Sequence, residues 1–117
     1  MPENVRELHC RYVSVSEGGG EYFQVLFGKT QDSDEAYLVV QRQFEMPDGG
    51  ECYVETVDRA FCGHFHVRNA RLTRSHFEFE FGDPPARTIK VSFEVTDSSY
   101  ADAKRTLRIM IPDLESQ

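Results

Sequence analysis

The sequence predicts an α+β fold, in which a mainly antiparallel curved sheet of about seven strands carries one C-terminal helix packed on it. Residues 77–81 are Phe at every odd position, and residues 89–95 are Ile, Val or Phe at every odd position. Such alternation is typical of strands with one buried and one solvent-facing side. Segment 82–87 between them holds a glycine and two prolines, which favour a turn. We therefore expect an antiparallel hairpin, followed by a helix where the apolar spacing changes after residue 96.

Five further segments, all before this hairpin, have the composition of strands. The third of them begins with four consecutive apolar or aromatic residues, which indicates a strand covered on both faces at that point. The sequence Pro-Asp-Gly-Gly that follows is a strong turn signal and predicts a second hairpin with the next segment. The five segments are residues 8–15, 22–27, 37–44, 52–57 and 61–72.

The last of these segments has a defect in its alternation. Phe65 and Val67 share one parity, whereas Ala70 and Leu72 fall on the other. A β-bulge inserts one extra residue and so changes which parity faces inward. We therefore expect a bulge near residues 68–69.

The end of the chain predicts one amphipathic helix. Ser99 is the expected N-cap, with Asp102 at the third helical position, and Pro112 is expected to end the helix. The apolar residues that would share its buried face are Tyr100, Ala103, Leu107, Met110 and Ile111.

Length and charge restrict the possible functions. The chain has 117 residues, which suits a single domain over 1–117 with a core of about residues 8–111. Its net charge is −7, from 20 acidic and 13 basic residues. This balance disfavours binding to nucleic acid, which needs clustered Lys and Arg, and binding to anionic membranes. It permits a basic protein partner, because opposite potentials steer association.

The termini and cysteines predict a cytoplasmic location. The N-terminal residues are charged and lack the apolar segment of a secretory signal, and no run approaches the length of a membrane span. The three cysteines, Cys10, Cys52 and Cys62, are an odd number without metal-type spacing. We expect buried free thiols in a reducing compartment.

Histidines offer a metal-site hypothesis. His64 and His66 lie two residues apart, so that on a strand their side chains share one face, and His76 could approach them across a hairpin. The metal-binding His-x-His of cupins also has a nearby Glu, which residues 67–70 do not supply. The favoured interpretation is that these histidines face solvent opposite Phe65, and we expect no metal and no cofactor.

Nucleophilic catalysis is a further hypothesis. Cys62 precedes His64 by two residues, a spacing that superficially resembles a thiol with its base. On a strand such side chains diverge, so a direct hydrogen bond between them is not expected. No phosphate-binding loop is present, because the Gly-Gly-Gly of residues 18–20 precedes a strand and lacks the following Lys. The sequence therefore predicts a protein that is not an enzyme.

Acidic residues gather around two expected loops. If both loops opened on one end of the sheet, their carboxylates would form a negative surface suited to a basic protein. The predicted partner-binding residues are Asp32, Asp34, Glu35, Glu45, Asp48, Glu51, Glu55 and Asp58.

The order of three motifs resembles a known family. A strand with the sequence Tyr-Leu-Val-Val-Gln-Arg at 37–42 leads through an acidic turn to Tyr-Val-Glu at 53–55, and an aromatic–Gly step follows at 61–63. Over about residues 22–111 this resembles the immunity protein 10 family, small bacterial proteins associated with polymorphic toxin systems. Cys62 and the neighbouring histidines lie outside the resemblance, and no binding residue is carried over from it.

The resemblance implies a small cytoplasmic inhibitor that binds a cognate toxin domain and blocks it without catalysis. A basic nuclease domain would suit an acidic partner. Two alternatives stay open. One is a metal-dependent enzyme that uses His64 and His66. The other is a small-ligand-binding β-barrel whose apolar cavity would be lined by Phe23, Phe27, Phe77, Phe79, Phe81 and Phe93.

Overall fold

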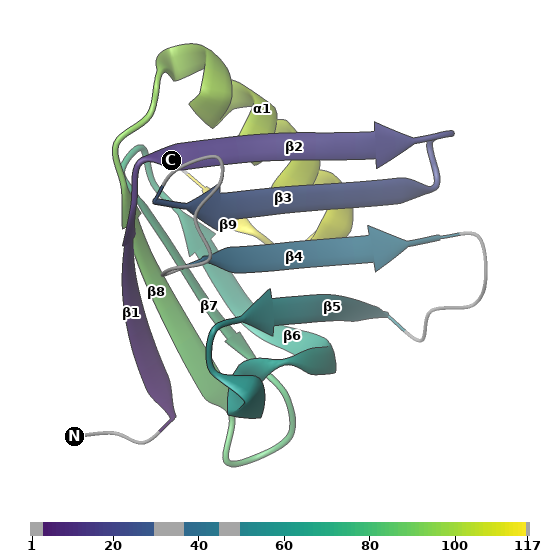
Figure 1. Ribbon diagram of the computed structural model, residues 1–117. Coiled ribbons are helices and arrows are strands. Elements are labelled where there is room, and N and C mark those ends of the chain that lie inside the picture. Colours follow the sequence, from purple (N-terminus) through teal and green to yellow (C-terminus); the bar gives the residue numbers. More distant parts are fainter. Residues whose placement is uncertain (1–3, 30–36, 45–49, 117) are drawn as a thin grey trace.

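The computed structural model describes residues 4–29, 37–44 and 50–116 (Figure 1). Within these ranges, nine strands form one open, curved sheet in the order β1-β8-β7-β6-β5-β4-β3-β2, and β9 pairs with β6. The strands are β1 (Val5–Cys10), β2 (Tyr12–Gly18), β3 (Tyr22–Gly28), β4 (Leu38–Gln43), β5 (Glu51–Thr56), β6 (Gly63–Leu72), β7 (His76–Phe81), β8 (Arg87–Phe93) and β9 (Glu115–Ser116). The helices are the short 3₁₀ helix η1 (Arg59–Phe61) and the α-helix α1 (Asp97–Met110).

The α+β class is confirmed, but the expected number of about seven strands is wrong. The segment 8–15, expected to be one strand, is divided at Arg11 into the end of β1 and the start of β2. β1 pairs with β8 in parallel, whereas β2 pairs with β3 antiparallel. Both strands alternate, so the residue pattern does not mark the corner between them. The two-residue β9 is too short to produce a periodic signal.

The predicted bulge in β6 is confirmed, and it divides the sheet into two halves. The register of β6 against β7 shifts between Val67 and Asn69. The start of β6 pairs with β5, and its later part pairs with β7. We call β1, β8, β7, β9 and the end of β6 the first half, and β2 to β5 with the start of β6 the second half. The bulge lets one strand belong to both halves while its apolar side chains keep facing inward.

The alternating hairpin is also as expected. β7 and β8 pair antiparallel with Phe77 opposite Val91 and Phe79 opposite Ile89, and all four side chains are buried. The turn after β7 requires glycine at position 82, where φ is +88°. A Cβ atom there would also lie only 3.3 Å from the Phe65 ring.

Phenylalanine rings fill the space between the two halves. Phe27 of β3 stacks on Phe77 of β7 with ring centroids 5.5 Å apart, and it lies 5.6 Å from Phe93 of β8. Along β7, the rings of Phe77 and Phe79 and then of Phe79 and Phe81 are stacked at 5.2 and 4.7 Å. These aromatic contacts join the inner faces of both halves into one core.

The helix covers the inner side of the sheet at β2 and β3 (Figure 1). It begins earlier than expected: the N-cap is Thr96, whose hydroxyl accepts from the backbone N–H of Ser99 at 3.1 Å, so Ser99 lies inside the first turn. At the other end, Arg42 of β4 donates to the carbonyl of Met110 at 2.7 Å. The helix ends before Pro112, as predicted. No helix in the described ranges has the length and apolar character that crossing a membrane requires.

The buried side of α1 supplies a stability test with a matched control on the same helix. Leu107 is fully buried, whereas Ile109, two residues on, is 38% exposed. Leu107→Ala should lower the free energy of unfolding by about 2–5 kcal/mol through lost burial and a cavity. Ile109→Ala should change it by no more than about 0.5 kcal/mol. Urea unfolding of both variants measures this, and equal effects would contradict the assigned helix face.

Candidate functional site

The structure describes three of the eight acidic residues predicted to bind a partner. Asp32, Asp34, Glu35, Glu45 and Asp48 lie outside the described residues. These residues belong to two segments, 30–36 and 45–49. The described residues next to them are Tyr37 and Phe44, which lie at opposite ends of β4. Of the three that remain, Glu51 and Glu55 share one face of β5, and Asp58 lies beyond its end. Glu51 and Glu55 are therefore the two described acidic residues that lie together on one strand face.

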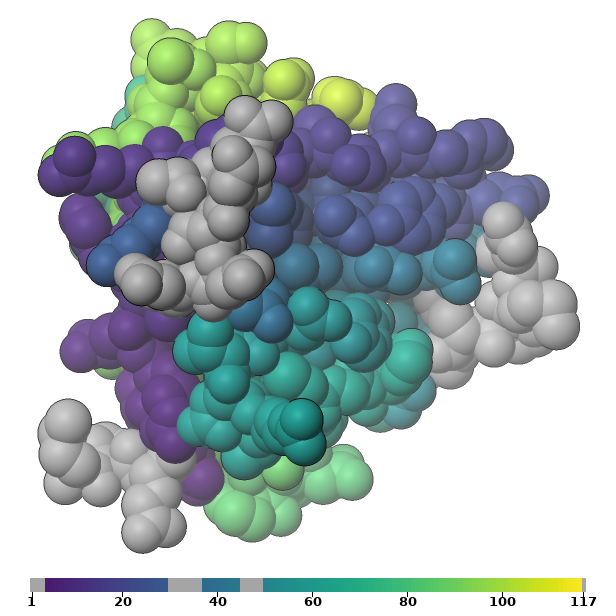
Figure 2. All heavy atoms as spheres, in the orientation of Figure 1, coloured from purple at the N-terminus to yellow at the C-terminus, as the bar shows by residue number. Residues whose placement is uncertain are grey.

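The outer face of the second half is mostly polar, with Leu26 and Val39 as apolar residues on it. On β5 the buried side chains alternate with Glu51, Tyr53 and Glu55, which are half-buried and point away from the core. Strand register places Gln41 of β4 opposite Tyr53, which in turn lies opposite His64 of β6. Figure 2 views the molecule in the orientation of Figure 1, with the side chains of β2 to β5 forming a continuous surface.

Glu55 is held by two tyrosine hydroxyls. Tyr53 on the same strand donates to Oε1 at 2.9 Å, and Tyr37, beside the start of β4, donates to Oε2 at 3.2 Å. The hydrogen bond and charge of Glu55, together with burial, raise the pKa of Tyr53. Burial and then the same carboxylate raise the pKa of Tyr37. Both phenols therefore stay protonated donors at neutral pH.

Glu51 has a different neighbour. Its carboxylate lies 3.7 Å from Nε2 of His66, directly across the β5–β6 pair. Both side chains are well exposed, at 39% and 62%. Because its side chain is exposed, Glu51 is accessible to a partner. An exposed ion pair of this kind contributes little to stability.

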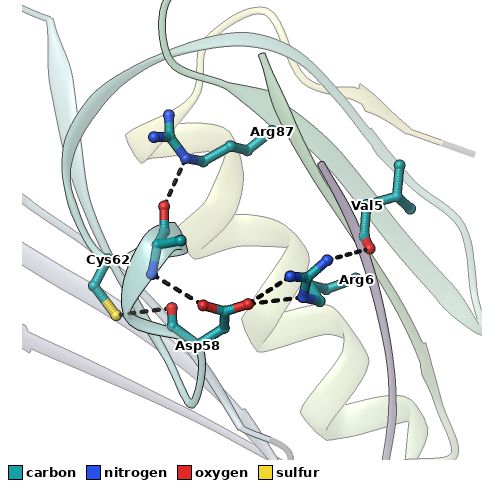
Figure 3. Close-up of polar contacts among 6 residues, drawn as sticks. Val5, Arg6, Asp58, Cys62 and Arg87 are labelled. Atoms are coloured by element: carbon teal, nitrogen blue, oxygen red, sulfur yellow. Dashed lines mark hydrogen bonds and ion pairs between the residues drawn. The ribbon is translucent and has the colours of Figure 1, made fainter. Parts of the chain in front are cut away.

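Asp58 belongs to a junction between distant strands (Figure 3). Its Oδ2 accepts from Nε and Nη2 of Arg6 in β1 at 2.8 and 2.7 Å, and its Oδ1 accepts from the backbone N–H of Ala60 at 3.0 Å. The guanidinium of Arg6 also lies over the Phe61 ring, 4.6 Å from its centroid. Arg87 of β8 donates to the carbonyl of Ala60 at 2.6 Å. Asp58 thus ties η1 to the first half of the sheet, and its charge is largely engaged within the molecule.

The histidines do not come together. His64 and His66 are exposed on the outer face of the second half, as the alternation predicts. His76 lies at the start of β7 in the first half, where its Nδ1 is 2.9 Å from the hydroxyl of Ser75. The expectation that His76 could approach the other two is therefore wrong. Among the residues that the structure describes, no group of three His, Cys, Asp or Glu is placed to hold a metal ion.

The Cys62 thiol is bonded to backbone groups. Its Sγ donates to the carbonyls of Thr56 and Asp58 at 3.3 and 3.5 Å and accepts from the Thr56 N–H at 3.4 Å. These contacts close the turn between β5 and β6. The thiol therefore acts as a structural link at the end of β5.

A groove on the outer face of the first half was not anticipated. It has a volume of about 560 Å³, and His9, Ser92 and His76 form one side of it. Beside them runs a row of alternating charge across five strands, composed of Glu7, Lys90, Glu78, Arg71 and Glu115. Alternation in β7 and β8 placed Glu78 and Lys90 outward. The complete row also requires that β1 pairs in parallel with β8 and that β9 pairs with β6. No residue pattern in the sequence predicted either pairing.

Comparisons with known proteins gave no relative. No family model matches the chain, and searches of curated proteins and of solved structures found no match either.

The Asp58 junction predicts a dependence of stability on pH. Hydrogen bonds from Ala60 and Arg6 lower the pKa of Asp58 below its ordinary value of 3.8. A lowered pKa in the folded state means that the stabilisation is complete above the unfolded-state value and is lost as pH falls through the folded-state value. Asp58→Asn should therefore be less stable than the wild type at pH 6, and the difference should shrink below pH 3.8.

Thermal unfolding between pH 6 and pH 2 measures this difference. Asp83→Asn, in the exposed turn after β7, is the control. Its unfolding temperature should change with pH in the same way as that of the wild type. A constant gap between wild type and Asp58→Asn at all pH values would contradict the role given to the Arg6 ion pair.

Proposed function

We propose that this protein is a cytoplasmic, non-catalytic immunity protein that binds and neutralises a cognate bacterial toxin domain. The observation that carries the proposal is the outer face of β5, where the half-buried Glu51 and Glu55 flank Tyr53. Acidic and tyrosine side chains together on an accessible strand face suit a basic protein surface.

The charge of the whole chain supports the same partner. A net charge of −7 attracts a cationic protein at long range. Toxin domains that act on nucleic acid carry basic surfaces to hold phosphates, and an acidic inhibitor can occupy such a surface. The resemblance of about residues 22–111 to the immunity protein 10 family is the reason for proposing that this binding neutralises a toxin.

The small-ligand alternative has less support. It needs the inward phenylalanines to border an open cavity, yet the rings of Phe27, Phe77, Phe79 and Phe81 lie in contact with one another. Closely packed rings bury their surfaces against one another, so those surfaces are not open to a ligand.

Co-expression tests the immunity role directly. The gene beside this one should encode a toxin domain, and cells that produce that domain should survive when this protein is also produced. The two purified proteins should elute together in gel filtration. Unchanged killing together with separate elution would overturn the proposal.

Charge reversal tests the surface. The double variant Glu51→Lys, Glu55→Lys should associate with that toxin domain about 10-fold more slowly at low salt, because attraction becomes repulsion. The difference should shrink in high salt. Stopped-flow association measures both effects.

The matched control carries the same change in net charge elsewhere. Asp102→Lys, Asp113→Lys alters exposed residues in α1 and just after it, away from the β5 face. Equal slowing by both double variants would show that net charge alone governs association and that the β5 face is not the contact surface.

A further inference from the structure

The carboxylate of Glu55 is only partly used by its two tyrosine neighbours. A carboxylate offers about four lone-pair sites. The hydroxyls of Tyr53 and Tyr37 take one site on each oxygen. One acceptor site on each oxygen is left, and the two oxygens are fixed side by side.

This arrangement is held in place by contacts behind it. The hydroxyl of the buried Thr56 donates to the carbonyl of Tyr37 at 2.6 Å, and Thr56 is itself bonded through its backbone to the Cys62 thiol. Strand register places Val39 opposite Glu55 and Leu38 opposite Thr56. The backbone positions of Tyr37 and Glu55 are therefore fixed, and a ligand would find the carboxylate already oriented.

Aromatic rings stand beside the same carboxylate. The ring of Tyr53 lies against His64, with centroids 5.1 Å apart and planes at 52°. Tyr37 reaches the other oxygen of the Glu55 carboxylate. The electron-rich faces of tyrosine rings attract cations. Within the described ranges, no lysine or arginine forms an ion pair with Glu55.

We infer that Glu55, Tyr37 and Tyr53 form a receptor for an arginine side chain presented by the protein partner, an inference that rests on the proposed function. The guanidinium is a planar fork that can donate two parallel hydrogen bonds to the two oxygens of one carboxylate. It also stacks on tyrosine rings. Lysine carries the charge but not the fork, so the geometry favours arginine.

A titration with a small probe tests the receptor without the toxin. The probe is N-acetyl-arginine amide, added to the intact protein while backbone amide shifts are followed by NMR. We expect saturable shifts centred on Tyr37, Tyr53, Glu55 and His64 at millimolar probe. The lysine analogue should bind at least several-fold more weakly. The citrulline analogue, which has nearly the same shape but no charge, should cause no saturable shift there.

Three variants locate the binding. Glu55→Gln keeps the shape and removes the charge, and it should abolish the response. Tyr53→Phe keeps the ring and removes one hydrogen bond, and it should weaken binding several-fold. Asp102→Asn, at an exposed position of α1 away from β5, should bind as the wild type does. Thermal unfolding checks that each variant is folded.

Equal responses to arginine and citrulline, or unchanged binding to folded Glu55→Gln, would overturn the receptor. These outcomes are separable from those of the proposed function. Toxin binding that survives Glu55→Gln would remove the receptor and leave the immunity role. Arginine binding at Glu55 without any toxin complex would remove the immunity role and leave the guanidinium site.

Discussion

Contact between phenylalanine rings across the two halves of the sheet is the constraint on which this structure depends. Phe27 of β3 stacks on Phe77 of β7, and the rings of β7 continue the stack to Phe81. To bring these faces together one strand must serve both halves, and the bulge in β6 allows this. Because these phenylalanine side chains are buried in the core, the groups available for binding are mainly the polar and charged side chains of the outer faces.

The end of β5 is where core architecture and surface chemistry meet. The Asp58–Arg6 pair fixes η1 against β1, and the Cys62 thiol closes the turn back to Thr56. Thr56 then holds the backbone of Tyr37, whose hydroxyl reaches Glu55. Cys62, singled out in the sequence as a possible nucleophile, thus holds the turn beneath the proposed contact surface through its bonds to backbone groups.

The two outer faces differ in how their charges are arranged. In the first half, cations and carboxylates alternate across the strands from Glu7 to Glu115, so opposite charges are neighbours. In the second half, Glu51 lies opposite His66. Glu55 lies opposite Val39 and accepts hydrogen bonds from Tyr53 and Tyr37. A cationic protein gains more from the second arrangement, because among the described residues no lysine or arginine forms an ion pair with Glu51 or Glu55. This contrast is why the proposed contact surface lies on β5.

Local patterns in the sequence predicted the α+β class, the hairpins β4–β5 and β7–β8 and the bulge in β6. Each of these follows from alternation or turn chemistry, which act between residues close in the chain. Tertiary structure alone decided the corner at Arg11, the parallel pairing of β1, the addition of β9 and the bond between Arg6 and Asp58, which are 52 residues apart. It also decided that Tyr37 meets Glu55. An alternating strand specifies which side is buried but not which strand lies beside it, and that choice is made by packing across the whole core.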